Sequence, residues 1–225
     1  MKQKLLILLC LSIFVSVVAA QDAESESYLS WTASHAESVG KNMRESSKIG
    51  HLIDFRGIHT DRSINYKFRA TWLTPEVIRA AARLEQLKNR LTDLQTRELV
   101  AEAESAGDTV FMIEIDPRQG SGVIPLDWRA ILQPKDLKVG AAGAVLGVKS
   151  PKFQKIKALA GTDRRDYDWD IFWVAFPLVD KDKNPLFAAD VTKLQMVVGI
   201  YESEGRLSWD VPASIRTKMK SLSHK

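Results

Sequence analysis

Three aspartates alternate with aromatic residues in one short segment of the chain. Asp166, Asp168 and Asp170 are separated by Tyr167 and Trp169. Alternate side chains of an extended strand point to the same face, so the three carboxylates are expected to converge. Carboxylate oxygens are preferred ligands of Ca²⁺, although such a site needs further oxygen ligands. The segment is therefore a candidate calcium site.

A second group of oxygen-bearing residues has the opening of a calcium loop. Asp180, Asp182 and Asn184 follow the D-x-D-x-N spacing of such loops. Pro185 stands where the loop needs a glycine, and Val191 stands where the bidentate glutamate belongs. The same residue types are common in hairpin turns, which is the alternative interpretation. No cofactor is expected from the sequence, and calcium is the alternative that these two segments suggest.

Histidines offer a third kind of chemistry, because two of them lie close together in the sequence. His51 and His59 could hold zinc or act as acid and base with Asp54 and Asp61 nearby. Along a straight strand these histidines would lie about 26 Å apart. A shared site therefore requires a bend at Gly57, and a hydrogen-bonded structural histidine is the alternative.

The sequence contains no G-x-S-x-G elbow, H-E-x-x-H motif or P-loop. No catalytic residue is assigned for this reason. Two carboxylates from distant parts of a chain can still meet in the folded protein. A small secreted hydrolase that uses carboxylates therefore remains the enzymatic alternative.

A basic segment between Lys135 and Lys157 carries six lysines and one acid, Asp136. Such a segment could bind a protein or an anionic polymer or surface of the cell envelope, and a solvated loop is the alternative. Nucleic acid is not expected, because only Phe153 offers a ring for base stacking here. The candidate partner-binding residues are Lys149, Lys152, Lys155, Lys157, Trp128, Tyr167 and Trp169.

Residues 1–20 have the three parts of a secretory signal peptide. Lys2 and Lys4 precede an apolar run, which ends in a small-residue cleavage site at Ala20. The run is shorter than the roughly 20 apolar residues of a spanning helix, so no transmembrane segment is expected after cleavage. Cleavage removes two lysines and no acid, which lowers the formal charge from +4 to +2. We expect a periplasmic or extracellular protein.

The mature chain would lack cysteine, because the single cysteine, Cys10, lies in the signal peptide. Disulfides, thiol nucleophiles and thiolate zinc sites are then excluded. No Asn-x-Ser/Thr glycosylation motif occurs either. An exported chain with neither feature points to a bacterial source.

Alternating hydrophobic residues predict most of the strands that must position these residues. A hairpin is expected from residues 49–58 and 64–72, in which Lys67, Arg69 and Thr71 face away from the apolar side chains. Further strands are expected at 109–115 and 128–132. Residues 171–176, 194–200 and 207–211 are expected to form a three-stranded meander.

Capping residues predict two helices within the β-rich segment. Thr74 and Pro75 mark a helix start, and Thr92 with Gln95 forms a capping box. An apolar stripe then continues to a helix end at Gly107. The helices are expected to form a hairpin or one bent helix.

The sequence predicts a mainly β fold with an α insertion, an antiparallel β-sandwich of possible immunoglobulin-like type. The leading functional hypothesis is an exported, non-catalytic binding or assembly module of the cell envelope. The alternatives are the carboxylate-dependent hydrolase and a calcium-stabilised adhesion domain. The expected segments are a signal peptide (1–20), a polar arm or marginal helix (21–47), one β-rich domain (48–215) with a helical insertion (75–106), and a basic tail (216–225).

Overall fold

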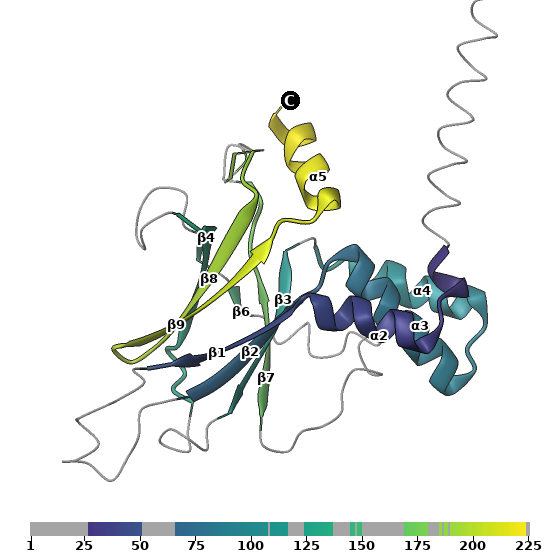
Figure 1. The fold of residues 1–225 in the computed structure, drawn as a ribbon, viewed down its shortest axis with the longest axis horizontal. Coiled ribbons are helices and arrows are strands. Elements are labelled where there is room, and N and C mark those ends of the chain that lie inside the picture. Colours follow the sequence, from purple (N-terminus) through teal and green to yellow (C-terminus); the bar gives the residue numbers. More distant parts are fainter. Residues whose placement is uncertain are drawn as a thin grey trace, which may run out of the picture.

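The fold combines α-helices with two antiparallel β-sheets in this computed structural model (Figure 1). The structure describes residues 27–50, 66–107, 109–116, 124–136, 145–146, 148–149, 169–179, 185, 187–188 and 190–223. The helices are η1 (Ser27–Ser30), α2 (Ala33–Asn42), α3 (Pro75–Asn89), α4 (Asp93–Glu104) and α5 (Ala213–Ser223). The strands are β1 (Arg44–Ile49), β2 (Tyr66–Trp72), β3 (Val110–Asp116), β4 (Arg129–Pro134), β5 (Val145–Leu146), β6 (Val148–Lys149), β7 (Asp170–Ala175), β8 (Lys193–Ile200) and β9 (Ser203–Asp210).

The first sheet has the strand order β1-β2-β3-β7-β6, and the second has the order β5-β4-β8-β9. Alternate residues of both sheets enter one hydrophobic core. An aromatic group joins the sheets there, because the ring of Phe111 lies 5.1 Å from the rings of both Trp72 and Trp209, measured between centroids. The predicted mixture of antiparallel strands with an α insertion is confirmed at this level.

β2 pairs with a strand that lies earlier in the sequence than the predicted hairpin placed its first strand. β1 ends at Ile49, the residue at which the alternation suggested a beginning, and it pairs antiparallel with β2. Residues 51–65, which include most of the expected strand, lie outside the described residues. The segment Arg44–Lys48 is polar and gave little sign of a strand. It is a strand because it pairs with β2, and not because alternate apolar residues bury one of its faces.

The predicted meander at the C-terminal end of the chain is wrong. β8 and β9 form the expected hairpin, with Leu194 opposite Trp209. β7, by contrast, pairs with β3 and β6 in the first sheet and makes no ladder with β8. Adjacency in sequence favours a meander, but strand order is decided by non-local pairing that alternation does not encode.

The two sheets approach each other closely where β9 crosses β1. The amide of Gly50 donates to the carbonyl of Glu204 at 3.4 Å. A Cβ atom on Gly205 would lie 2.5 Å from Cε1 of Phe68 and 2.6 Å from the carbonyl oxygen of Lys48. Only glycine fits this crossing without displacing the neighbouring strand.

Helices α3 and α4 form the predicted helical hairpin, and both expected N-caps are confirmed. The hydroxyl of Thr74 accepts a hydrogen bond from the amide of Val77. Thr92 and Gln95 make both hydrogen bonds of a capping box. Arg90 ends α3 in the left-handed conformation, with φ of 54° and ψ of 43°.

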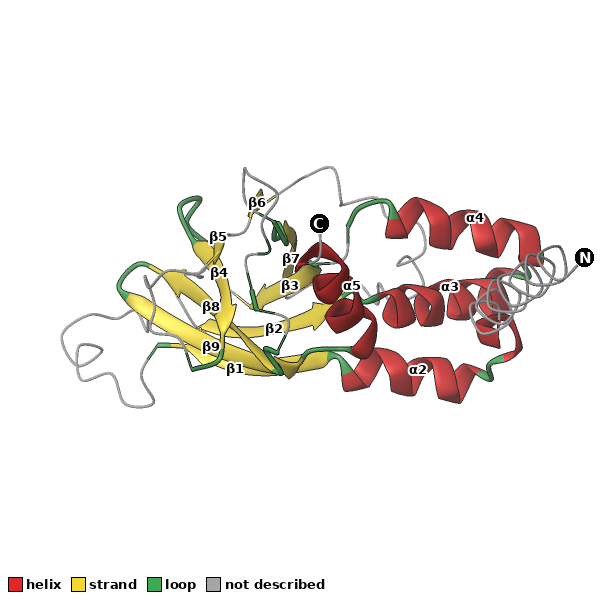
Figure 2. Ribbon diagram, turned by 90° about the horizontal axis from the view of Figure 1, so that it is seen from above, coloured by secondary structure: helices red, strands yellow, loops and turns green. Residues whose placement is uncertain are grey.

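The helices α2, α3 and α4 lie together beyond one end of the strands (Figure 2). They share a second hydrophobic cluster with the first sheet, through the side chains of Val110, Met112 and Trp173. These three residues belong to the face of the sheet that points away from the common core. The helical layer thus covers one end of that outer face.

The basic segment after Arg216 is helical as far as Ser223, where the sequence suggested a tail. Ile215 and Met219 of α5 are buried in the common core, whereas Lys218 and Lys220 are exposed. The amphipathic pattern of this short helix was difficult to recognise in the sequence, because only two of its apolar residues are fully buried and lysines lie beside them. None of the helices in the described part of the chain is long and apolar enough to span a membrane.

Candidate functional site

Most of the candidate calcium ligands lie outside the described residues. These are Asp166, Asp168, Asp180, Asp182 and Asn184. Asp170 is described; it begins β7 and its side chain is exposed. Among the residues that the structure places, no three histidine, cysteine, aspartate or glutamate side chains gather into a group that could hold a metal ion.

The candidate partner-binding lysines are also mostly outside the described part. Lys152, Lys155, Lys157 and Tyr167 are not described, and Lys149 is placed only as part of the short strand β6. His51, His59 and His224 are not described either. His35 is exposed on α2, and its ring meets the ring of Trp31 edge-on at 4.8 Å between centroids.

The two described tryptophans among the candidates have different environments. Trp128 is only 3% exposed, and its ring packs against Phe172 at 4.9 Å between centroids. The prediction of Trp128 as a contact at the rim is therefore wrong, because this side chain fills the core between the sheets. Trp169 is half-buried and contacts an arginine of the first sheet.

The surface around Trp169 is the polar end of the outer face of the first sheet. Strand register determines which residues share this face: Ser46 lies opposite Arg69 and Lys48 opposite Lys67, while Arg69 lies opposite Glu114. These side chains point away from the common core, since their neighbours Phe68 and Ile115 point into it. We call this surface the polar face, defined by Arg44, Ser46, Lys48, Lys67, Arg69, Thr71, Glu114, Asp116 and Trp169.

An ion pair with two hydrogen bonds occupies the middle of the polar face. Nε of Arg69 donates to Oε2 of Glu114 at 2.7 Å, and Nη2 donates to Oε1 at 2.6 Å. The Glu114 side chain is 6% exposed and that of Arg69 is 23% exposed. The planar guanidinium matches the carboxylate in this parallel geometry, so the pair fixes both side chains.

Trp169 covers the same guanidinium from another direction. The Cζ atom of Arg69 lies 4.4 Å from the centroid of the indole ring. A cation over an indole face is attracted by the electrons of the ring, in addition to its hydrogen bonds. Arg69 is therefore held in place from two sides, and it joins β2, β3 and the residue before β7.

Three further cations border this fixed pair, on β1 and β2. Arg44 and Lys48 are exposed on β1, and Lys67 is half-buried on β2. Nε of Arg44 donates to the hydroxyl of Thr71 at 3.2 Å, which orients its guanidinium along the sheet. Within the residues that the structure describes, no ion pair joins Arg44, Lys48 or Lys67 to an acid.

The polar face also contains two buried acids of β3. Glu114 and Asp116 are 5% and 3% exposed. They are two residues apart on one strand, so their Cα atoms lie about 7 Å apart and both side chains point outward. Such a spacing could serve two catalytic carboxylates. Both oxygens of Glu114 already accept hydrogen bonds from Arg69, which leaves that carboxylate occupied.

The alternation of residue types indicates the two faces of β2 correctly, but it gives no sign of the polar face. The alternation of Lys67, Arg69 and Thr71 with apolar residues was visible. Glu114 stands at an alternate position of the apolar strand β3, which was the one signal for a buried acid. The pairing of β2 with both β1 and β3, which brings the charges together, was not visible in the alternation.

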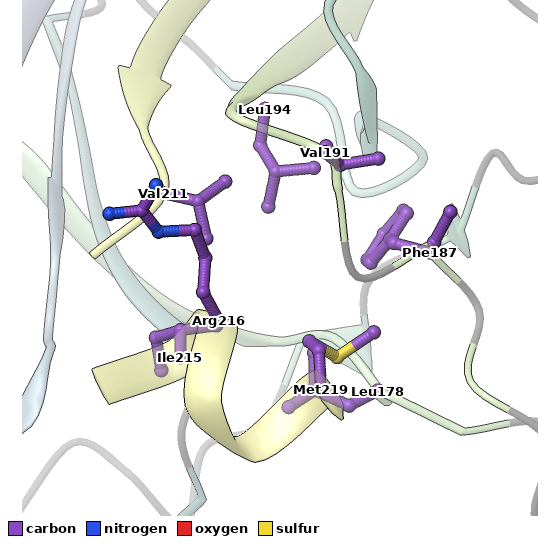
Figure 3. Close-up of a pocket in the computed structure, with 9 residues that line it drawn as sticks. Leu178, Phe187, Val191, Leu194, Val211, Ile215, Arg216 and Met219 are labelled. Carbon is purple, nitrogen blue, oxygen red and sulfur yellow. The ribbon is translucent and has the colours of Figure 1, made fainter. Parts of the chain in front are cut away.

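An apolar pocket lies apart from the polar face, between α5 and the segment that leads into β8 (Figure 3). Its walls include Leu178, Phe187, Leu194, Ile215 and Met219, and Arg216 is the charged residue among the described ones that line it. The pocket is narrow and partly open to solvent. It contains no described group for chemistry.

A second, larger pocket of about 330 Å³ lies where α3 begins and α4 ends, and it is also partly open to solvent. Nη2 of Arg79 and Oε1 of Glu104 lie 3.1 Å apart there. Their side chains are 27% and 35% exposed, beside Leu73, Ile78 and Gly107. The pair links the two helices across the hairpin.

Comparisons with known proteins give no assignment for the chain. No protein-family model matches the sequence, and no curated protein matches it. One solved structure with some similarity is a novel protein of unknown function from Burkholderia pseudomallei. It aligns with a TM-score of 0.40 and 9% sequence identity, over 91% of this chain and 93% of that chain. A likeness at this level supports no inference about function.

Proposed function

We propose that this protein is an exported, non-catalytic binding module of the bacterial cell envelope. One observation carries the proposal: the polar face presents Arg44, Lys48 and Lys67 without an acidic partner among the described residues. Surface cations are usually interspersed with acids, which keeps a surface soluble without attracting one kind of partner. A sheet face with several cations instead offers electrostatic complementarity to an anionic partner.

Export to the envelope rests on the signal peptide at residues 1–20. Its test is expression of the full chain in a bacterium, followed by fractionation and mass measurement. The expected product lacks Met1 to Ala20, begins at Gln21 and is recovered outside the cytoplasm. A recovered mass that still includes those residues would contradict export.

Binding is tested with the mature chain, residues 21–225, and isolated envelope fractions. We expect saturable retention of the protein on the insoluble envelope and release at high salt, because electrostatic attraction is screened by ions. The matched control is the same protein with washed beads of an uncharged polymer. Retention no greater than on the uncharged beads would overturn the proposed function.

A carboxylate-dependent hydrolase is the alternative function, and Glu114 and Asp116 are the two acids that it would use. In this interpretation Glu114 would have to leave Arg69 in order to act on a substrate. Turnover of an envelope polymer by the mature chain, lost in Asp116→Asn, would favour the enzyme over the binding module.

Calcium-stabilised adhesion would be supported if a chelator lowered the melting temperature, since a native-state ligand raises it.

For the architecture, we propose that the two sheets form a β-sandwich, because residues of both enter one hydrophobic core. The immunoglobulin-like version of this fold has less support. Constant-type immunoglobulin domains divide their strands as ABED and CFG. Here three consecutive strands, β1, β2 and β3, are neighbours in one sheet.

A further inference from the structure

We infer that the edge of the polar face formed by β1 and β2 binds a linear polyanion, a chain that carries carboxylate, sulfate or phosphate groups at regular intervals. This inference rests on the proposed binding function and names its surface and the chemistry of its partner. The surface consists of Arg44, Lys48 and Lys67, with Ser46 between the two cations of β1.

The strand geometry places two of these cations along β1, about 14 Å apart, and the third beside one of them on β2. Arg44, Ser46 and Lys48 are alternate residues of β1, so their side chains leave the same face at steps of about 7 Å. Lys67 lies directly opposite Lys48 on β2, about 5 Å away between backbones. Hydrogen bonding between the strands fixes the distances between these cations. Fixed distances between positive charges suit a partner whose negative charges also repeat along a chain.

The register of Lys48 and Lys67 is itself unfavourable for the isolated protein. Like charges directly opposite each other in antiparallel strands destabilise the pairing. Glu114 does not relieve this repulsion, because it binds Arg69 through both oxygens. Asp116 lies directly opposite Lys67 on β3, but among the described residues no ion pair joins these two side chains. A bound anion between the two lysines would turn the repulsion into attraction.

Arg44 and Arg69 have different roles at this surface. Arg44 remains exposed, and its bond to Thr71 keeps the guanidinium over the sheet where an anion can reach it. The charge of Arg69 is neutralised by Glu114, and its guanidinium is covered by Trp169. We therefore assign Arg69 a structural role and not a role in ligand binding. We therefore expect anion binding to depend on Arg44, Lys48 and Lys67 and not on Arg69.

A polymer fits this surface better than an anionic membrane does. Stable attachment to a membrane surface generally requires an apolar insertion in addition to basic residues. Large hydrophobic side chains that are exposed in the described part of the chain lie elsewhere: Leu87, Leu94, Leu126 and Tyr201. None of them belongs to β1 or β2.

The test measures binding of the mature chain to dextran sulfate, with uncharged dextran of the same length as the reference polymer. The test variant is Lys48→Gln/Lys67→Gln. The control variant, Lys88→Gln/Lys220→Gln, removes the same charge from exposed positions on α3 and α5. Unfolding midpoints are recorded for both variants, so that any loss of binding is assigned only to folded protein.

We expect wild type to bind dextran sulfate and not dextran, with an affinity that falls steeply between about 50 mM and about 200 mM salt. The test variant should bind at least about tenfold more weakly and show a smaller salt dependence. The control variant should stay within about twofold of wild type. Equal weakening in both variants would overturn the inference, because net charge alone would explain it.

Three further outcomes separate this inference from the proposed function. Tighter binding to vesicles of anionic phospholipid than to dextran sulfate would overturn the choice of a polymer. Retention on envelope fractions that is unchanged in Lys48→Gln/Lys67→Gln would overturn this surface while the binding function stands. Loss of envelope retention in wild type itself would instead overturn the proposed function.

Discussion

The indole nitrogen of Trp209 donates a hydrogen bond to the backbone carbonyl of Met43 at 3.0 Å, across 166 positions of the sequence. The amide of Trp72 donates to the same carbonyl at 3.1 Å. Met43 is the residue between α2 and β1. One carbonyl oxygen therefore connects the helical layer, the first sheet and the last strand of the second sheet.

Trp209→Phe removes the indole donor and is expected to destabilise the protein by about 1–2 kcal/mol. The loss should be moderate because the amide of Trp72 still satisfies the Met43 carbonyl. Urea unfolding followed by circular dichroism measures the change. As a control, Trp31→Phe alters a half-buried ring and should change stability by less than about 0.5 kcal/mol. Equal effects of the two substitutions would show that the Trp209 hydrogen bond is unimportant.

Gly205→Ala is expected to destabilise the protein by about 2–3 kcal/mol, because the new methyl group would overlap Phe68 and the Lys48 carbonyl. Gly40→Ala is the matched control. No atom lies within 4 Å of the added methyl group there, and Gly40 is in helix α2. Alanine should stabilise that helix by about 0.5–1 kcal/mol. Thermal melts of the two variants should thus shift in opposite directions; a shift in the same direction would contradict the tight crossing of β9 and β1.

Arg90→Gly should stabilise the protein by about 0.5–1 kcal/mol. Arg90 has φ of 54° at the end of α3, and the amide of Leu91 donates to the carbonyl of Gln86 in the same turn. Glycine adopts this left-handed conformation without the steric cost that a side chain brings. Chemical unfolding gives the measurement. A lower midpoint than wild type would mean that the Arg90 side chain contributes more than its conformation costs.

Arg69→Met should destabilise the protein by about 2–4 kcal/mol, because it leaves the Glu114 carboxylate buried without its partner. The double variant Arg69→Met/Glu114→Leu removes the buried charge as well and should recover much of that loss. A double-mutant cycle that includes Glu114→Leu alone gives the coupling between the two side chains. If the double variant were less stable than Arg69→Met, the pair would not be the source of the effect.

The elements that could be predicted from the sequence are those whose structure depends on neighbouring residues. The caps of α3 and α4 follow from Thr74, Pro75 and Thr92 within one turn of each helix, and these predictions are confirmed. The alternation within β2, β3 and β8 likewise identified which residues face the core. Burial of Trp128 could not be predicted in this way, because it depends on Phe172 from a distant strand.

The sequence by itself determined the helix boundaries set by capping side chains, the two faces of the main strands and the prediction of an export signal. All of these depend on local hydrogen bonds or on hydrophobic periodicity along a few residues. Only the tertiary structure decided that β7 joins the first sheet and that Arg69 meets both Glu114 and Trp169. It also placed Lys48 opposite Lys67. These relationships arise from pairing between distant strands, whose partners are selected by the packing of the whole core rather than by any local pattern.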